Sequence, residues 1–174
     1  MPNHSSSQAQ PAGSARTIRV LFVCTGNICR SPTAEAVFKH QVAQAGLAHL
    51  IGSDSAGTHH FHIGEPPDPR AQKAAGQRGY DLSGLRGRQV GQADFVEFDF
   101  VLAMDEDNLR ALQRLCPPQN SHKLQLFMAF SPAAGTREVP DPYYGGPKGF
   151  ERVLDLVEQA AQGLLRHLRA VISG

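Results

Sequence analysis

The sequence predicts a single α/β domain, in which a four-stranded parallel sheet carries helices on both faces. Three observations favour this class. Apolar, β-branched runs alternate with segments of helical spacing. The chain's 174 residues lie in the single-domain range. Its 41% hydrophobic and 19% charged content suffices for a normal core.

The first half of the domain is expected to hold two strands and two helices. An apolar, β-branched run predicts the first strand over 18–23. The first helix is predicted over 31–46, because Pro32 suits a first helical turn. A second strand is expected near 49–55 and a second helix near 69–78.

The second half continues the alternation. An apolar run predicts a strand over 98–104, and Asp105 is expected to cap a helix over 106–115, whose acidic residues cluster at its positive end. A short strand is expected over 123–127. The last helix is predicted to begin near Gly149, after which apolar residues recur at helical spacing.

The composition of the chain limits the binding partners and the cellular compartment that can be expected for the protein. Residues 1–16 are rich in Ser, Gln, Ala and Pro and lack the apolar stretch of a signal peptide, so a disordered tail is expected there, with the folded domain over 17–174. The net charge is +1, and no basic stretch is dense enough to predict binding to nucleic acid or to a membrane. Three cysteines make no secreted disulfide framework, which favours a reducing, cytoplasmic location.

The eight residues over 24–31, Cys-Thr-Gly-Asn-Ile-Cys-Arg-Ser, combine a thiol and a guanidinium in one short loop after the first strand. Successive N–H groups of such a loop can turn inward, and the next helix adds positive potential, so a dianion such as phosphate is the predicted ligand. The same potential favours the nucleophilic thiolate. The residues expected to form this loop are Thr25, Gly26, Asn27, Ile28, Cys29 and Arg30.

Individual side chains of the loop suit defined chemical roles. Cys24 is predicted to attack phosphorus, and Arg30 to bind two phosphoryl oxygens and stabilise transition-state charge. Ser31 is expected to donate its hydroxyl to the Cys24 sulfur, and Asn27 tolerates the left-handed backbone of a tight loop. The alternative is a packed Cys24 beside a solvated Arg30, which the order of strand, glycine turn and Pro-led helix disfavours.

A second candidate site lies in the segment 139–146, where two prolines stiffen the backbone around Asp141. An aryl ester leaves as phenolate, which departs more readily when a carboxylic acid protonates it. Asp141 is therefore predicted to act first as general acid and then as general base toward water. The alternative is a purely structural Asp-Pro turn.

Together, Val-Cys-Thr-Gly-Asn-Ile-Cys-Arg-Ser-Pro near the start and Asp-Pro-Tyr-Tyr-Gly near the end resemble the bacterial type of the low-molecular-weight protein tyrosine phosphatase family. Similar motifs lie between them, so the resemblance covers roughly 17–170. It implies a phosphotyrosine hydrolase without metal or cofactor, which forms a cysteinyl phosphate on Cys24. It also implies that Asn27 and Ser31 support the thiolate.

The expected substrate wall is formed by Ile28, Phe61, Tyr143 and Tyr144. Apolar and aromatic side chains there would enclose a phenyl ring, and phosphoserine would stop short of the loop. For Phe61 the alternative is ordinary core packing. A related branch that acts on phosphoarginine carries Thr in place of Ile28, so the resemblance favours phosphotyrosine. The implied partner is a phosphotyrosine-containing protein, in a bacterium a tyrosine kinase.

The other cysteines and the polar clusters leave alternatives open. The resemblance implies that Cys29 is a redox partner of Cys24. The alternative is that Cys29 has no redox role and is simply a small residue that lines the loop. Cys116 is expected to be an inert packed thiol. The cluster His59, His60 and His62 lacks the further ligands of a zinc site, which favours a solvated or pocket-rim loop. The run Asp105-Glu106-Asp107 favours a helix start over magnesium binding.

Two other functions compete with the phosphatase. An arsenate reductase of the same fold would need paired distal cysteines, which this chain lacks. A non-catalytic phosphotyrosine-binding module would be favoured by the loss of nucleophile or acid, yet Cys24, Arg30 and Asp141 are all present.

Overall fold

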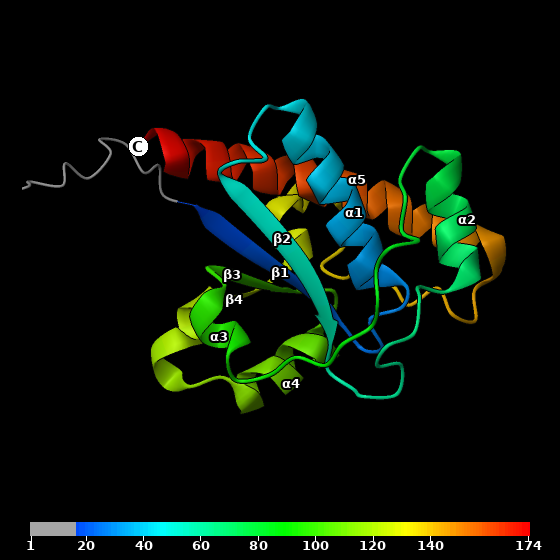
Figure 1. The fold of residues 1–174 in the computed structure, drawn as a ribbon, viewed down its shortest axis with the longest axis horizontal. Helices are drawn as coiled ribbons and strands as arrows, with labels where there is room; N and C mark the ends of the chain where they lie inside the picture. Colours follow the sequence, from blue (N-terminus) through cyan, green and yellow to red (C-terminus); the bar gives the residue numbers. More distant parts are fainter. Residues whose placement is uncertain (1–16) are drawn as a thin grey trace, which may run out of the picture.

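The computed structural model describes residues 17–174, and the tail expected over 1–16 lies outside the described residues. Four parallel strands form one sheet in the order β2-β1-β3-β4 (Figure 1). Ile18 of β1 pairs with Ile51 of β2, and Val20 of β1 pairs with Phe100 of β3. The predicted parallel sheet is confirmed. Its strands are β1 (Ile18–Cys24), β2 (Ile51–Gly57), β3 (Phe100–Ala103) and β4 (Leu124–Leu126).

Helices cover both faces of this sheet, as the sequence predicts. The α-helices are α1 (Arg30–Gln44), α2 (Pro69–Gln77), α3 (Asp94–Glu97), α4 (Glu106–Leu115) and α5 (Gly146–Ser173). Three 3-10 turns are η1 (Pro118–Lys123), η2 (Phe127–Phe130) and η3 (Pro132–Ala134). Figure 1 shows α1 and α5 on one side of the sheet and α3 and α4 on the other.

The central strand β1 is buried on both faces, because successive side chains of a strand point in opposite directions. Val20 and Phe22 join the core beneath α1 and α5, and Leu21 and Val23 join the core beneath α3 and α4. Cys24, the last residue of β1, is likewise buried. Burial on both sides explains why this strand is a nearly continuous apolar run.

Several element boundaries differ from those expected. Helix α1 ends at Gln44, because Gly46 adopts a left-handed φ of 72° and closes the helix, and a turn then delays β2 to Ile51. Strand β3 begins at Phe100 rather than at residue 98, because Phe98 caps the short helix α3, which was not expected from the sequence. The last helix begins at Gly146, three residues early, with Pro147 in its first turn.

Ion pairs of a single arginine, Arg78, link α2 to α5. The guanidinium of Arg78, just after α2, lies 2.6 Å from Glu151, 2.9 Å from Asp155 and 2.9 Å from Glu158. These three carboxylates belong to successive turns of α5 and raise the pKa of Arg78 despite the opposing effect of burial. The position of α2 relative to the start of α5 is therefore fixed by charge as well as packing.

Within residues 17–174, no helix is long and apolar enough to span a membrane.

Gly163 lets α5 approach the main chain of η2, and its replacement is expected to destabilise the fold. A Cβ atom at this position would overlap the carbonyl oxygen of Phe130. We expect Gly163→Ala to lower the free energy of unfolding by about 1–3 kcal/mol, because a backbone carbonyl cannot move aside as a side chain can. Denaturant titration measures this change. The matched control is Gly76→Ala in α2, where a Cβ meets nothing within 4 Å, and equal stabilities of the two variants would contradict the prediction.

Candidate active site

The loop between β1 and α1 opens into a pocket of about 280 Å³ at the carboxyl end of the sheet. This location follows the general placement of ligands in open parallel sheets. The structure brings together residues from the loop, from the segment around Phe61 and from the segment around Asp141. The lining residues are Cys24, Thr25, Gly26, Ile28, Cys29, Arg30, Phe61, His62, Asp141, Tyr143 and Tyr144.

The Cys24 sulfur sits inside a set of hydrogen-bond donors. Its Sγ lies 3.0 Å from Ser31 Oγ and accepts the N–H of Asn27 at 3.3 Å. The Ser31 oxygen accepts a hydrogen from Asn27 Nδ2 at 2.8 Å. The serine hydrogen has two acceptors within reach, the Cys24 sulfur at 3.0 Å and the Ala56 carbonyl oxygen at 3.4 Å. The thiolate support that the sequence predicts from Ser31 is consistent with this geometry.

Asn27 holds the loop in its strained shape. Its φ is 57°, and within residues 17–174 it is the one non-glycine residue with positive φ. Its side chain also donates to Ser55 Oγ at 3.0 Å and accepts the N–H of Arg88 at 3.0 Å. Ser55 in turn donates to the buried carboxylate of Glu35 at 2.7 Å. The left-handed residue expected from the sequence is thus fixed by partners from distant segments, which local reasoning did not identify.

Arg30 is buried and held by a carboxylate. Its side chain is 3% exposed, and Nη1 donates to Asp105 Oδ2 at 2.6 Å and to the Val139 carbonyl at 3.1 Å. Burial by itself would lower the pKa of Arg30, but the Cys24 sulfur and the Asp105 carboxylate outweigh it and raise the pKa. The guanidinium therefore keeps its charge in the pocket.

Asp105 is a site residue that the sequence analysis assigned only to helix capping. Its Oδ1 accepts the N–H of Asn108 at 2.7 Å and caps α4, as predicted. Its Oδ2 holds Arg30. The available signal was that Asp105 follows a buried strand. Because β3 lies next to β1, the residues after both strands meet.

Asp141 lies at the rim of the pocket, with a side chain that is 56% exposed. Its Oδ1 accepts the N–H of Tyr143 at 3.1 Å, and its Oδ2 lies 3.8 Å from Arg30 Nη2. The carboxyl group is thus oriented by its own turn and lines the same pocket as the loop residues. The prediction that Asp141 and the loop share one site is consistent with this geometry.

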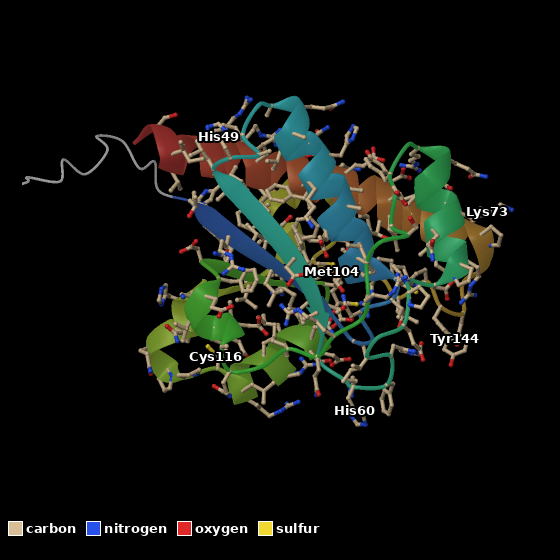
Figure 2. The ribbon with its side chains drawn as sticks, viewed as in Figure 1. His49, His60, Lys73, Met104, Cys116 and Tyr144 are labelled. Carbon is tan, nitrogen blue, oxygen red and sulfur yellow. The ribbon has the colours of Figure 1, made fainter. Side chains whose placement is uncertain are left out.

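Aromatic side chains rise on two sides of the pocket. The rings of Tyr143 and Tyr144 meet edge to face at 4.9 Å, and Tyr144 is 94% exposed. Figure 2 shows Tyr144 projecting at the edge of the molecule. Phe61 is 68% exposed and packs on His59 and His60, so core packing of Phe61 is the wrong alternative. Its loop projects beyond the sheet, where no core is available.

His62 lines the pocket, which agrees with the pocket-rim position expected for the histidine loop. Its Nδ1 lies 2.7 Å from Glu65 Oε2, and its ring packs closely on Gly26. Gly87 permits this arrangement, because a Cβ there would overlap the His62 carbonyl oxygen. The three histidines do not converge. Among residues 17–174, no group of three or more His, Cys, Asp or Glu side chains is placed to hold a metal ion.

The two remaining cysteines differ in environment. Burial, and then the negative charges of Asp68, Cys24 and Asp141, raise the pKa of the Cys29 thiol to about 12. Cys29 is therefore a neutral thiol at physiological pH. Cys116 ends α4, is partly buried, and has a pKa raised by that burial, as expected for an unreactive thiol.

A parallel sheet whose first strand delivers a thiol into an amide-lined loop closed by a buried arginine defines a class of protein, one that binds an oxyanion against a cysteine. Comparisons with known proteins identify the family within this class. The model for "Low molecular weight phosphotyrosine protein phosphatase" matches residues 19–172. The chain belongs to this family.

Individual relatives agree with the assignment. A low molecular weight protein-tyrosine-phosphatase of Streptomyces coelicolor is 49% identical over 161 residues, which cover 91% of this chain and 98% of that protein. A protein tyrosine phosphatase structure from Entamoeba histolytica is 44% identical, with a TM-score of 0.86 over 88% of this chain and 98% of that one. The structure of a drosophila arginine phosphatase is 33% identical, with a TM-score of 0.80 over 87% of this chain and 98% of that one.

Proposed function

We propose that this protein hydrolyses phosphotyrosine in protein substrates through a cysteinyl-phosphate intermediate on Cys24. The observation that carries the proposal is the position of the Cys24 sulfur, which accepts the Asn27 N–H and lies 3.0 Å from Ser31 Oγ inside a pocket that Arg30 and Asp141 also line. The nucleophile, the oxyanion donors and the proton donor therefore share one cavity.

In the first step, the loop amides and Arg30 bind the non-bridging oxygens of the phosphoryl group. The Cys24 thiolate attacks phosphorus, the P–O bond to the phenol breaks, and Asp141 gives its proton to the leaving oxygen. Arg30 is suited to this role because Asp105 and the Val139 carbonyl fix its orientation before substrate binds. A preoriented guanidinium stabilises transition-state charge without having to reorganise.

In the second step, the Asp141 carboxylate accepts a proton from water, whose oxygen attacks phosphorus as the P–S bond breaks. The departing sulfur takes the electron pair and returns to the thiolate. Ser31 and the Asn27 N–H stabilise the charge on this leaving group, as they do in the resting enzyme. Inorganic phosphate then leaves through the open rim near Tyr144.

The pocket walls support phosphotyrosine as the substrate. Ile28, Phe61 and Tyr143 present apolar or aromatic surface above the loop, so a phenyl ring would be enclosed while its phosphate reaches the loop amides. Phosphoserine has no ring to fill this space. Arsenate reduction is disfavoured because the pocket is lined by Cys24 and Cys29 but not by Cys116.

Catalysis in excess chelator tests the proposal. Wild-type protein is assayed with p-nitrophenyl phosphate and with peptides that carry phosphotyrosine, phosphoserine or phosphoarginine. We expect chelator-resistant turnover that favours phosphotyrosine and falls about 10²–10⁴-fold in Asp141→Ala, since a positioned general acid contributes about that factor. Absence of turnover by the reduced wild type would overturn the proposal in favour of phosphotyrosine binding or arsenate chemistry.

Ile28 is expected to discriminate against phosphoarginine. Its side chain lines the pocket beside the phosphate loop, and a hydroxyl there would offer a hydrogen-bond partner to a guanidinium nitrogen. We expect Ile28→Thr to raise the ratio of phosphoarginine to phosphotyrosine hydrolysis by about tenfold. The two kcat/KM values are measured on peptides of identical flanking sequence. Ile28→Val, which keeps an apolar surface, is the matched control, and an unchanged ratio in Ile28→Thr would contradict the prediction.

Cys29 is expected to rescue the enzyme from oxidation. Peroxide converts the Cys24 thiolate to a sulfenic acid. The Cys29 sulfur then attacks the sulfenic sulfur while its proton passes to the departing hydroxyl, so water leaves and a disulfide forms, which added thiol reduces. Peroxide inactivation should therefore be largely reversible in the wild type. In Cys29→Ser, we expect most of the activity to stay lost after thiol treatment, as measured with p-nitrophenyl phosphate. Equal recovery in both proteins would refute this role, and Cys116→Ser is the control.

We further propose residues 17–174 as the phosphatase domain and residues 1–16 as an appended tail. The supporting observation is that the matched family model spans residues 19–172. The free thiols Cys24, Cys29 and Cys116 support a reducing compartment, the cytoplasm. A phosphotyrosine-containing protein is the proposed partner, in a bacterium a tyrosine kinase.

A further inference from the structure

A groove of about 360 Å³ runs between α2 and the start of α5, beside the active-site pocket. It is lined by Arg70, Lys73 and Gln77 from α2 and by Lys148, Phe150 and Glu151 from α5. In Figure 2, Lys73 on α2 and Tyr144 on the adjoining loop lie at the same end of the molecule. We call this feature the α2–α5 groove.

The groove shares a wall with the pocket. Arg70 donates to the Tyr143 carbonyl at 2.9 Å, and its guanidinium carbon lies 5.1 Å from the centre of the Tyr143 ring and 5.0 Å from the centre of the Phe150 ring. Tyr143 lines the active-site pocket and Phe150 lines the groove. One guanidinium therefore separates the two spaces. An extended peptide advances about 3.3–3.6 Å per residue, so a side chain two or three positions from the phosphotyrosine would reach the groove.

The groove carries positive charge that the protein itself does not neutralise. Arg70 is paired with Asp68 at 2.9 Å, and Glu151 is paired with Arg78 at 2.6 Å. In the part of the chain that the structure describes, Lys73 and Lys148 form no ion pair, and both are exposed. Two ammonium groups without an ion-pair partner thus line the same groove, one from each helix, together with the apolar Phe150 ring. A carboxylate with an aliphatic stem matches both surfaces.

We propose that the α2–α5 groove is a specificity subsite, in which Lys73 and Lys148 bind a glutamate or aspartate near the phosphotyrosine of the substrate. This inference rests on the proposed function, because it needs a phosphotyrosine in the adjacent pocket. Charge complementarity favours an acidic peptide as the occupant. The subsite leaves the chemistry unchanged and selects among phosphotyrosine sequences.

Matched peptides test the subsite. One peptide has Glu at the three positions on each side of the phosphotyrosine, and its partner has Gln at the same positions. The readout is the ratio of their kcat/KM values, so that any general change in a variant cancels. We expect the wild type to favour the Glu peptide by roughly threefold to tenfold at low salt, since each exposed ion pair contributes modestly. The preference should shrink as salt is added.

Removing or reversing the charges of Lys73 and Lys148 tests whether these two lysines cause the preference for the Glu peptide. We expect Lys73→Gln with Lys148→Gln to bring the ratio near one, and Lys73→Glu with Lys148→Glu to invert it. The matched control is Arg166→Gln with Arg169→Gln, which removes the same two charges from exposed positions toward the other end of α5. Peptides with Glu on only one side of the phosphotyrosine then show which side enters the groove.

The outcomes separate this inference from the proposed function. Wild-type turnover of p-nitrophenyl phosphate with equal kcat/KM for the Glu and Gln peptides would overturn the subsite and leave the phosphatase intact. A preference that survives in the Lys73→Gln, Lys148→Gln variant, or that disappears equally in the control, would also overturn it. No turnover of p-nitrophenyl phosphate by the wild type would instead refute the proposed function.

Discussion

Cys24→Ser is expected to abolish hydrolysis of p-nitrophenyl phosphate and of phosphotyrosine peptides, by about 10⁴-fold or more. The serine hydroxyl stays protonated at neutral pH. The hydrogen-bond donors around position 24 cannot make this hydroxyl as strong a nucleophile as a thiolate. The Asn27 N–H and Ser31 Oγ, which contact the Cys24 sulfur, would then surround a neutral oxygen. Steady-state kinetics at neutral pH, with reductant and excess chelator present, measure the loss.

Binding distinguishes a chemical loss from a collapsed loop. In Cys24→Ser, the loop amides and Arg30 remain, so a phosphotyrosine peptide should still bind in calorimetry. The control Cys116→Ser should keep full turnover, because Cys116 lies at the end of α4 and outside the pocket. Residual turnover of Cys24→Ser near the wild-type rate would mean that Cys24 is not the nucleophile.

Arg30→Lys is expected to lower kcat/KM by about 10²–10³-fold, although the charge is conserved. The Arg30 guanidinium donates through Nη1 to Asp105 and the Val139 carbonyl, and Nη2 points toward Thr25 and Asp141 at the pocket. A single ammonium group cannot keep the buried contacts and also bind two phosphoryl oxygens. The protein should fold, since the new cation can still pair with Asp105.

Two measurements isolate this geometric effect. Urea titration of Arg30→Lys reports the stability of the fold, and kcat/KM with p-nitrophenyl phosphate reports the site. Arg86→Lys is the matched control, because Arg86 is exposed and bonds only nearby carbonyls. We expect it to leave turnover unchanged. An Arg30→Lys enzyme with wild-type kcat/KM would show that charge alone, without the planar fork, suffices.

Much of the fold followed from local patterns. The apolar run of β1, the capping by Asp105 and the helical spacing of α5 predicted their elements, because burial and hydrogen bonding act on neighbouring residues in these cases. Boundaries were less predictable. Helix α3 is four residues long and shows too little of a period to be recognised, and its position displaced the start of β3.

The loop residues and Asp141 could be proposed from the sequence alone because a thiol, a guanidinium and a carboxyl group each carry their chemistry in the residue type. The residues that hold these side chains in place could not be proposed in this way. Asp105 lies 75 residues from Arg30, and the Asn27 side chain finds Ser55 and the Arg88 amide in other segments. His62 reached the pocket only because Gly87 lets its loop lie close to the main chain.

The four strands, the helices α1, α2, α4 and α5, the family resemblance and the proposed roles of the loop residues and Asp141 could be predicted from the sequence. Only the folded structure shows which carboxylate holds Arg30, which side chains hold Asn27 in place, and that α2 and α5 form a basic groove beside the pocket. The physical reason is the distance along the chain over which each kind of interaction acts. Periodicity and capping express interactions within a few residues, whereas these contacts depend on the strand order β2-β1-β3-β4 and on helix packing.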